Sequence, residues 1–378
     1  MANTITDLLV TIMARGLPAL RKAAVMPRLV RTDFSTELAS KGKTVDFPLP
    51  QTQAVSDVSP SATPLTPGNV TADTVQLTLD KWKHTSFHLT DQELTQIEAR
   101  ANFLPMQMEM AFKALGEQLN SDLMALYKDI YGYVGTAGTT PFASTVAAAT
   151  DARKTLNKQL APLDPRFGVL DPDAMANALN LAGFSSFQQS SDPNVIINGM
   201  LGRKYGFDWA EDQQVPSHTK GAAGTVLVDQ ADVEVGDTTV HFDGLTTKAS
   251  AGDVFTVAGD TQTYVVVSAS DLTSTDGDMT FYPPAVVAWA NDAAVTFKAT
   301  HVANLAFHRD AFALAIRPLA DSVSQLLPGV VQQVMTDPLT GIPVRVEVIR
   351  QNKQTVFDLD ILYGVKTLRP ELACRIAG

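Results

Sequence analysis

The sequence predicts an α+β protein, and three stretches of the 378-residue chain carry that prediction. Residues 74–89 alternate between apolar and polar side chains, which is typical of a β-strand. Residues 105–131 repeat apolar side chains at spacings of three and four, which indicates a long helix. Residues 222–299 hold six short β-runs between Gly-Asp and Asp-Gly turns, which indicates a small antiparallel barrel or sandwich inserted into a parent domain.

Composition and charge exclude several classes of protein. The content is 45% hydrophobic and 18% charged, which is typical of a globular chain, and no apolar run is long enough to span a bilayer. The start, MANTITDLLV, has no basic segment before an apolar one, so we expect no signal peptide. Cys374 is the only cysteine, which excludes an intrachain disulfide and a cysteine-based zinc site. The formal charge of −11 argues against tight binding of nucleic acid.

The first 90 residues predict two short helices and then extended chain. Residues 4–15 and 19–26 are amphipathic, and the arginines and lysine between Arg15 and Arg31 are expected on a solvated helix face. Val45–Leu49 is expected to be extended and, because of its prolines, at a sheet edge. Residues 51–72 have three prolines and no aromatic residue, so we expect a long loop.

Residues 74–89 are expected to form one strand, about 50 Å long at 3.3 Å per residue. One side of this strand would carry alternate residues, namely Val75, Leu77, Leu79, Lys81, Lys83, Thr85, Phe87 and Leu89. The other side would carry Trp82, His84 and His88. Such a strand is unusually long for a compact domain, which indicates an extended subunit.

The long helix is expected over Pro105–Tyr131, about 40 Å at 1.5 Å per residue. Pro105 suits its first turn, where a proline loses no hydrogen bond, and Gly132 ends it. A mixed α/β region follows. We expect helices over 145–160 and 194–201, strands over 166–170 and 204–212, and a helix from Asp171-Pro172 to Asn180, with Asp171 as its N-cap.

The C-terminal region predicts a β-hairpin. The segments PVRVEVIR and TVFDLDILYG flank the turn QNKQ, and pairing of Arg350 with Thr355 sets the register. One face then carries Val344, Val346 and Val348 against Ile361, Leu359 and Phe357. The other face places Arg345 opposite Asp360 and Glu347 opposite Asp358.

His308-Arg309-Asp310 is the tripeptide of the protein-kinase catalytic loop, but its surroundings argue against that function. A kinase needs an Asn five residues after the Asp to bind metal, and Ala315 stands there. The chain also has no glycine-rich phosphate loop and no later DFG. Because apolar residues alternate on both sides of the triplet, we expect it to mark the end of a strand.

The remaining chemical patterns are also interpreted as structural. Gly42-Lys43-Thr44 precedes an edge strand rather than the helix that a phosphate loop requires. His84 and His88, on a strand, would lie about 13 Å apart, too far to share a metal. Asp358 and Asp360 are about 7 Å apart on one strand face, as an acid/base pair would be, but a ladder of carboxylates on an exposed sheet is the preferred interpretation. We therefore expect no catalytic residues, no metal and no cofactor.

Three stretches and the order of the elements resemble a known family. The stretches are NGMLGRKYGFDWAEDQQVP, AGDVFTVAG and LYGVKTLRPE. The chain resembles the major capsid proteins of tailed bacteriophages with the Hong Kong 97 type fold, in particular the Salmonella-phage type of coat protein with an added β-barrel. This chain is short for that branch. The resemblance implies a virion protein, assembled in the host cytoplasm, that forms an icosahedral shell around double-stranded DNA.

The resemblance also implies a division of the chain and a set of partners. The expected parts are an N-terminal arm (1–40), an extended β-hairpin arm (41–90), a spine helix (91–132), an apical α/β domain (133–221), an inserted barrel (222–299) and a return with a closing hairpin (300–378). The expected partners are further copies of the chain in hexamers and pentamers, scaffolding and portal proteins, and packaged DNA through weak non-specific contacts. No membrane is expected.

Contacts between copies are expected at the hairpin arm. In the family this arm lies over a neighbouring subunit, so Val75, Leu77 and Leu79 would bury there. Lys81 and Lys83 would then meet Asp358 or Asp360 of the neighbour. The alternative interpretation is a carbohydrate-binding or adhesion protein, suggested by the β-rich insertion and by Trp82, Trp209 and Trp289, which are expected to be exposed.

Overall fold

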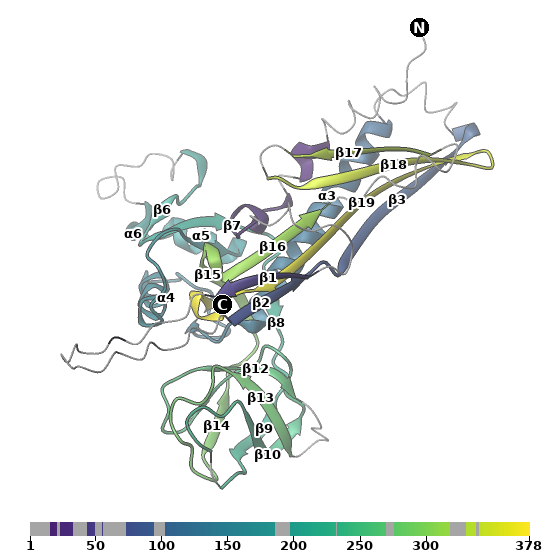
Figure 1. The fold of residues 1–378 in the computed structure, drawn as a ribbon. Helices are drawn as coiled ribbons and strands as arrows, with labels where there is room; N and C mark the ends of the chain where they lie inside the picture. The colour runs from purple at the N-terminus through teal and green to yellow at the C-terminus, as the bar shows by residue number, and fades with distance from the viewer. Residues whose placement is uncertain are drawn as a thin grey trace, which may run out of the picture. The chain divides into compact units, whose positions relative to one another are not determined.

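The computed structural model describes residues 16–20, 23–32, 44–49, 55, 73–93, 103–185, 197–231, 233–269, 276–317, 330–337 and 340–378. Figure 1 shows the fold, coloured from the N-terminus to the C-terminus, and the chain divides into two units. Unit 1 comprises Met1–Arg31, Ile97–Ala313 and Lys366–Gly378, and unit 2 comprises Thr32–Gln96 and Leu314–Val365. The α+β class predicted from the sequence is confirmed.

Unit 1 contains the long helix. Helix α3 spans Phe103–Met124 and continues as a 3₁₀ helix, η2, over Ala125–Asp129. The helix thus begins two residues before Pro105, and its end tightens before Tyr131. Its buried residues follow the predicted apolar positions, namely Met108, Phe112, Leu115, Leu119 and Leu123, each at most 2% exposed. Packing of this stripe, rather than intrinsic propensity, stabilises a helix of this kind.

A seven-stranded mixed sheet forms the body of unit 1. The strand order is β4-β20-β15-β5-β7-β6, and β8 also pairs with β15. The bounds are β4 Tyr133–Gly135, β5 Arg166–Leu170, β6 Arg203–Lys204, β7 Phe207–Glu211, β8 Ser217–His218, β15 His301–His308 and β20 Ala373–Ala377. The sheet's order therefore brings together segments from before and after residues 222–299.

Most of the expected α/β elements are present in unit 1. Helices α4 (Ala147–Lys158) and α5 (Pro172–Asn180) lie where they are predicted, and α6 spans Ala182–Ser185. The Asp171 carboxylate caps α5 by accepting from the Asp173 N–H at 3.2 Å. The expected strand over 204–212 is instead a hairpin, because Tyr205 and Gly206 both take a positive φ and turn the chain between β6 and β7.

The helices predicted over 19–26 and 194–201 are present only in part among the described residues. Residues 4–15 and 194–196 lie outside the described residues. Residues 16–20 are helical, and Met26–Arg28 forms a 3₁₀ helix, η1, with Pro27 in its first turn. Of the predicted helix at 194–201, only residues 197 and 198 are helical among those described.

Unit 2 contains a two-stranded sheet and a five-stranded sheet. Strand β1 (Thr44–Leu49) pairs with β2 (Asp73–Thr78). The larger sheet has the order β16-β19-β18-β17, with β3 also on β19. Its bounds are β3 Lys81–Thr90, β16 Phe312–Arg317, β17 Val330–Thr336, β18 Pro343–Gln351 and β19 Gln354–Thr367, and β16 and β19 each extend into the ends of unit 1.

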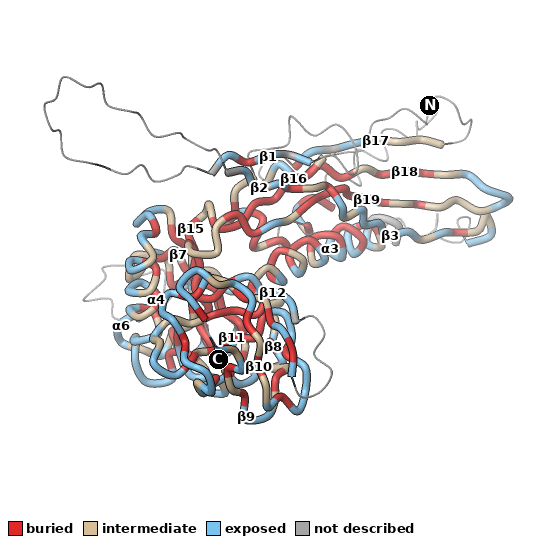
Figure 2. Tube along the Cα trace, turned by 60° about the horizontal axis from the view of Figure 1, so that its bottom comes forward, coloured by how far each residue is buried: buried red, intermediate tan, exposed pale blue. Residues whose placement is uncertain are grey.

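The predicted register of the C-terminal hairpin is confirmed. Arg350 pairs with Thr355, Arg345 with Asp360 and Glu347 with Asp358. The apolar partners of this hairpin are buried, and the alternation of buried and half-buried residues along β18 can be followed in Figure 2. The short turn fixes the register, and a slip of one residue would move every apolar side chain to the polar face.

The single strand predicted over 74–89 is wrong, because the chain divides into β2 and β3. Leu79 is fully buried between them, and each strand pairs with a different partner, β1 or β19. Gly364 of β19 lies so close to the Thr78 carbonyl oxygen that a Cβ at this position would overlap it. This close approach of β19 coincides with the break, and it leaves no mark on the local alternation of the sequence.

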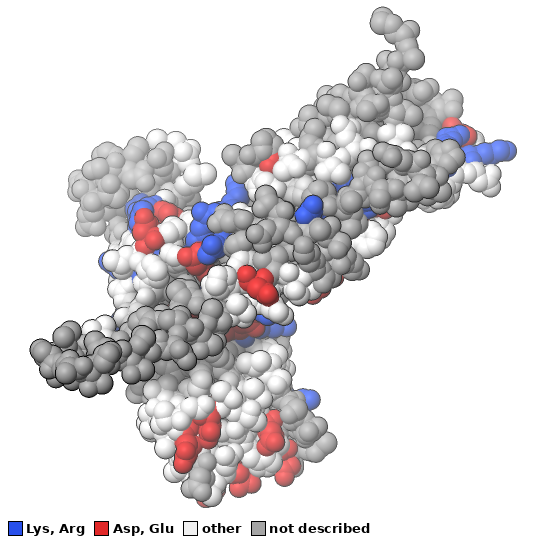
Figure 3. Space-filling model, viewed as in Figure 1, with Lys and Arg blue, Asp and Glu red and all other residues white. Residues whose placement is uncertain are grey.

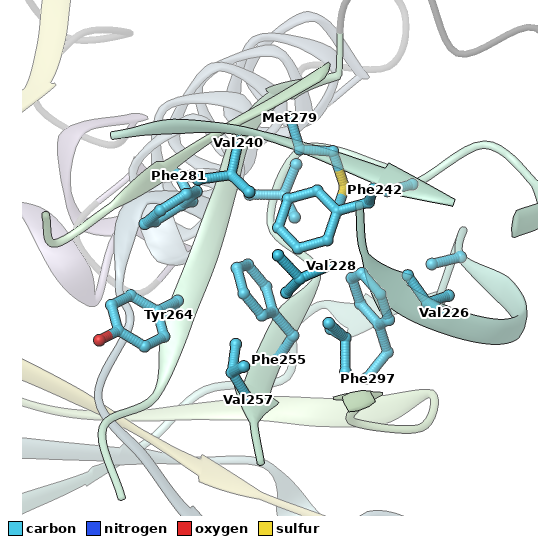
Figure 4. Close-up of a cluster of buried hydrophobic side chains, with 14 of the residues drawn as sticks. Val226, Val228, Val240, Phe242, Phe255, Val257, Tyr264, Met279, Phe281 and Phe297 are labelled. Atoms are coloured by element: carbon cyan, nitrogen blue, oxygen red, sulfur yellow. The ribbon is translucent and has the colours of Figure 1, made fainter. Parts of the chain in front are cut away.

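Residues 222–299 form a closed six-stranded barrel, in the order β10-β13-β12-β11-β14-β9. The bounds are β9 Ala223–Val228, β10 Thr239–Thr247, β11 Val254–Val257, β12 Tyr264–Ala269, β13 Gly277–Tyr282 and β14 Ala294–Phe297. The interior is aromatic, and Figure 4 shows Phe242, Phe255 and Phe281 pointing into it. All six β-runs predicted from the sequence are therefore strands, and the architecture is a barrel rather than a sandwich.

Candidate functional site

The His308-Arg309-Asp310 triplet lies at the end of a strand, as predicted. Strand β15 ends at His308, a single 3₁₀ turn (η3) covers Arg309–Ala311, and β16 begins at Phe312. The His308 Nδ1 accepts from the Asp310 N–H at 3.2 Å, and the Arg309 Nε donates to the Val30 carbonyl at 3.4 Å. Asp310 lies 3.6 Å from the Arg31 guanidinium. These contacts hold the turn and the N-terminal segment together.

The residues that the structure describes hold neither a metal-binding cluster nor a membrane-spanning helix. Within those residues, no group of three His, Cys, Asp or Glu side chains converges as a metal site would require. His84 and His88 both lie on β3 and are exposed, and His84 contacts Asp358 at 3.1 Å. Of the helices described, none combines the length and the apolar character needed to cross a membrane.

A connected group of charged residues covers the polar face of the five-stranded sheet. The Asp360 carboxylate accepts from Trp82 Nε1 at 2.8 Å and from Arg345 Nε at 2.9 Å, and Arg345 also lies 3.1 Å from Glu347. Burial is the main cause that raises the pKa of Glu347. Asp360 is only 6% exposed, so this carboxylate is held by partners in its own chain.

The other residues predicted to contact a neighbouring copy are distributed over both faces of unit 2. Leu77 and Leu79 are buried within the chain, whereas Val75 and Lys81 are half-buried and Lys83 is exposed. In the register of β3 and β19, Lys83 pairs with Ile361, and Ser86 and His84 pair with Asp358 and Asp360. Within one chain, Lys83 therefore points to the opposite face from these carboxylates, and a lysine–carboxylate contact between copies stays a prediction.

A second polar group, which the sequence did not predict, lies where the barrel joins the rest of unit 1. We call this group the neck cluster and define it as Tyr127, His218, Asp253, His301 and Arg375. The Asp253 carboxylate accepts from the backbone N–H groups of Gly221, Ala222 and Ser250 at 2.9–3.2 Å. It also contacts His218 Nε2 at 2.8 Å. Asp253 therefore links His218 on β8 to the start of the barrel, at Gly221 and Ala222, and to Ser250 before β11.

The protonation states in the neck cluster follow from its hydrogen bonds. A carboxylate only accepts, so His218 Nε2 donates to Asp253, and the other ring nitrogen, Nδ1, is hydrogen-bonded to the Tyr127 hydroxyl at 3.1 Å. Burial opposes the charged form of Asp253, but the bonds from His218 and the three backbone N–H groups outweigh it and lower the pKa of this carboxyl. Burial also lowers the pKa of His301 to about 4, so this imidazole is neutral.

Arg375 completes the neck cluster from β20. Its guanidinium donates to the Gly252 carbonyl at 2.8 Å and to the Lys128 carbonyl at 3.2 Å, and it lies 5.1 Å from the centroid of the Tyr127 ring. Burial lowers the pKa of Arg375 to about 10, so the side chain keeps its charge at neutral pH. Gly252 has a φ of +98° and packs against Lys128, where a Cβ would be strained. The barrel is thus attached to its unit by buried charges.

The neck cluster was missed because its members come from five separate segments. Asp253 belongs to a Gly-Asp pair that was interpreted as a turn, and Arg375 lies in an apolar run, ACRIAG. A charged residue inside a short apolar strand is the one local signal, since such a residue is seldom fully buried without partners.

The tryptophans that suggested an adhesion protein are mostly interior. Trp289 is 4% exposed and packs with Tyr264 and Phe281 inside the barrel, at centroid distances of 5.1 Å. Trp209 is 7% exposed and packs with Phe142 and Phe184. Only Trp82 is exposed, at 49%, and its indole is hydrogen-bonded to Asp360. The expectation of three exposed tryptophans is wrong for two of them.

Comparison with known proteins gives structural similarities at low sequence identity. A structure of Mycobacterium phage Che8 matches over 93% of this chain and 90% of that chain, with 12% identity and a TM-score of 0.48. The capsid of the cyanophage P-SCSP1u matches over 94% and 88%, with 13% identity and a TM-score of 0.49. The mature capsid of bacteriophage PhiM1 matches over 94% and 86%, with 12% identity and a TM-score of 0.46.

No family model matches the chain, and no curated protein matches it.

Proposed function

We propose that this protein is the major capsid protein of a tailed bacteriophage, many copies of which form an icosahedral shell around double-stranded DNA. The observation that carries the proposal is the order of the elements along the whole chain. A two-stranded hairpin precedes a 22-residue helix, a mixed sheet follows, a closed barrel interrupts that sheet, and the chain returns through a long hairpin. This is the order that the Hong Kong 97 type fold implies.

The barrel supports the finer assignment to the Salmonella-phage type of coat protein. It lies between β8 and β15, which are neighbours in the sheet of unit 1. An insertion at such a point lengthens the chain without changing the sheet that receives it. The added β-barrel is the feature by which that branch was distinguished in the sequence.

The length of the strands in unit 2 supports a structural role. Strand β19 has 14 residues, about 46 Å at 3.3 Å per residue, against about 5–6 residues in a usual strand. Such a sheet offers a wide face to neighbouring copies. Among the proposed contact residues, Val75, Lys81, Lys83 and Asp358 retain some exposure for this purpose, whereas Leu77, Leu79 and Asp360 contribute by holding the contact surface in shape.

The proposed partners are further copies of the chain, as hexamers and pentamers, together with scaffolding and portal proteins. Packaged DNA is expected to make only weak, non-specific contacts, since a chain of net charge −11 offers few clustered cations to phosphate. The proposed location is the virion shell, after assembly in the host cytoplasm.

The test is assembly. The protein is expressed alone and together with the neighbouring phage genes, and the products are studied by analytical ultracentrifugation and negative-stain microscopy. We expect closed shells or capsomers under at least one condition. A protein that stays monomeric in every condition would contradict the proposal.

A further inference from the structure

The barrel carries most of the negative charge of the chain. Residues 222–299 hold eleven Asp and Glu residues, two Lys and no Arg, so they account for −9 of the formal −11. Figure 3 shows acidic side chains gathered over the barrel on the face in view. Two barrels placed against each other would therefore repel.

One part of this acidic barrel is apolar and exposed. Val235, Val286 and Val287 are 67%, 55% and 45% exposed, and we call them the valine patch. These valines lie on two loops, residues 233–236 and 285–289. Backbone hydrogen bonds hold the loops side by side, from Gly236 N to Ala285 O at 2.9 Å and from Trp289 N to Val233 O at 3.2 Å. Exposed acidic residues lie within six positions of these valines along the chain, namely Asp229, Glu234 and Asp292. A contiguous apolar patch of this kind commonly marks an interaction surface.

A second exposed apolar surface lies at the end of α4, and its exposed neighbours on the helix are basic rather than acidic. Leu160 is 88% exposed and Leu163 is 64% exposed, and we call this pair the leucine knob. Exposed basic residues precede it on α4, namely Arg153, Lys154 and Lys158, which line a shallow hollow. Lys154 forms an ion pair with Asp151 at 2.9 Å, and Arg203 forms one with Asp164, next to Leu163 in the chain, at 2.6 Å.

Leu160 is held outward by a strained backbone. Its φ is +58°, and it follows the C-cap of α4 in the position where helices usually have Gly. The hydrogen bonds are those of the usual helix end, from Leu160 N to Asn157 O at 3.1 Å and from Ala161 N to Leu156 O at 3.0 Å. A leucine in this conformation is disfavoured and its side chain gains no burial in its own chain, so the strain points to a role outside the subunit.

We propose that the valine patch of one copy docks on the leucine knob of a second copy, with the acidic rim of the barrel facing the basic side chains of α4. This proposal rests on the proposed function and specifies one of its contacts. A valine patch cannot pair with a second valine patch, because their acidic rims would meet. It cannot fold back onto its own leucine knob, because the neck cluster fixes the barrel to unit 1 and leaves both surfaces exposed.

A contact between two different surfaces of identical chains is heterologous, and such contacts repeat from copy to copy until a ring closes. The proposed contact would therefore link successive subunits around one capsomer. Its opposite charges would favour the correct partner and disfavour barrel-to-barrel association.

The first experiment separates assembly from folding with Leu160→Gly. Glycine suits a φ of +58°, so we expect the melting temperature of the unassembled subunit to rise. We expect the protein concentration needed for half-assembly to rise about three- to tenfold, because the knob loses its side chain at an apolar contact. A variant that melts higher and assembles like the wild type would overturn the role of Leu160.

The second experiment traps the contact in the full-length chain. The only native cysteine, Cys374, is fully buried, so it should not form crosslinks and any crosslink can be assigned to the new surface cysteines. Assembled particles carrying both Val287→Cys and Leu163→Cys are oxidised mildly and run on a non-reducing gel. We expect a ladder of covalent multimers from the double variant. Each single variant is the matched control and is expected to stay largely uncrosslinked.

The outcomes also distinguish the two proposals. Shells without crosslinks in the double variant would overturn this contact and leave the capsid function standing, with the valine patch covered by a different protein. Crosslinks in the Val287→Cys single variant would mean that the patch pairs with itself and would likewise overturn the contact. A wild-type chain that forms no assembly at all would contradict the capsid function itself.

Discussion

At the scale of single residues, the neck cluster combines buried charges with hydrogen bonds from several segments of the chain. A carboxylate, a guanidinium and two imidazoles lie together out of water, and all are at most 3% exposed. Buried charges are tolerated when they are paired and hydrogen-bonded, and removing one partner leaves the other uncompensated. The cluster therefore makes the attachment of the barrel sensitive to single substitutions.

We expect Asp253→Asn to destabilise the protein by about 3 kcal/mol, because Arg375 and His218 lose the charge that faces them. The change should be seen as a lower melting temperature and as faster hydrogen exchange at the start of β11. Asp278→Asn is the control, since Asp278 lies in an exposed ion pair with His241 and should cost less than about 1 kcal/mol. Equal losses for the two variants would count against the role assigned to Asp253.

His301 should make stability depend on pH. Its pKa falls from 6.5 to about 4 on folding because burial disfavours the imidazolium. The unfolded chain therefore binds this proton first as the pH falls. The stabilisation is complete above pH 6.5 and is lost progressively down to about pH 4, by roughly 3 kcal/mol in all.

This dependence is measured by urea denaturation between pH 7 and pH 4 in the wild type and in His301→Gln. The variant should show a flatter profile over this range. His241→Gln is the control, since His241 is 38% exposed and paired with Asp278. A wild-type profile that is unchanged by His301→Gln would refute the assignment.

At the scale of elements, the sequence predicted the barrel and the C-terminal hairpin well. Their strands are short, their alternation is local, and turns at fixed positions leave little choice of register, as with Arg350 and Thr355. The division of residues 74–89 was missed, because it depends on where Gly364 of a distant strand meets Thr78. The neck cluster was missed for the same reason: its members meet only once the sheet has formed.

Gly364→Ala tests whether that close approach sets the break between β2 and β3. A Cβ would overlap the Thr78 carbonyl, and backbone cannot move aside as a flexible side chain can. We expect a loss of about 1–3 kcal/mol, measured by denaturant unfolding. Lys366→Ala, at an exposed position two residues along β19, is the control and should change stability by less than about 0.5 kcal/mol.

The barrel is predicted to fold on its own. It is a closed structure with its own aromatic core, so it needs no neighbouring strand to cover an edge. A fragment of residues 217–302 should give a dispersed β-type NMR spectrum and melt higher than a fragment of residues 222–299. The longer fragment keeps His218 and Gly221, which donate to Asp253. Disordered spectra from both fragments would show that the barrel depends on the rest of unit 1.

At the scale of the whole molecule, the proposed capsid function requires a subunit that keeps surfaces for neighbouring copies while remaining folded alone. The hairpin arm of unit 2 was predicted to make such a contact through the loop at residues 51–72. Of this loop only Val55 is described, and Ser56–Pro67 lie outside the described residues. The contact made by this loop is therefore still a prediction.

We predict that deletion of Ser56–Pro67 leaves a folded subunit that does not close a shell. Strands β1 and β2 pair on either side of the deleted segment and provide the subunit's own contacts. Circular dichroism should be close to that of the wild type, whereas sedimentation should show only small species. Shells of normal size from this variant would mean that the loop is dispensable for closure.

The pairing of β8 with β15 has a practical consequence for engineering. His218 lies opposite His301 and Ser217 opposite Val302, so the chain leaves the sheet and returns to it at neighbouring positions, about 5 Å apart. A domain whose own ends lie close together can be grafted between such positions, provided that it also supplies partners for His218 and Arg375 in place of Asp253 and Gly252. The barrel is in this sense a domain that could be replaced by another. In the proposed shell, an antigen or an enzyme inserted in its place would be displayed once per subunit.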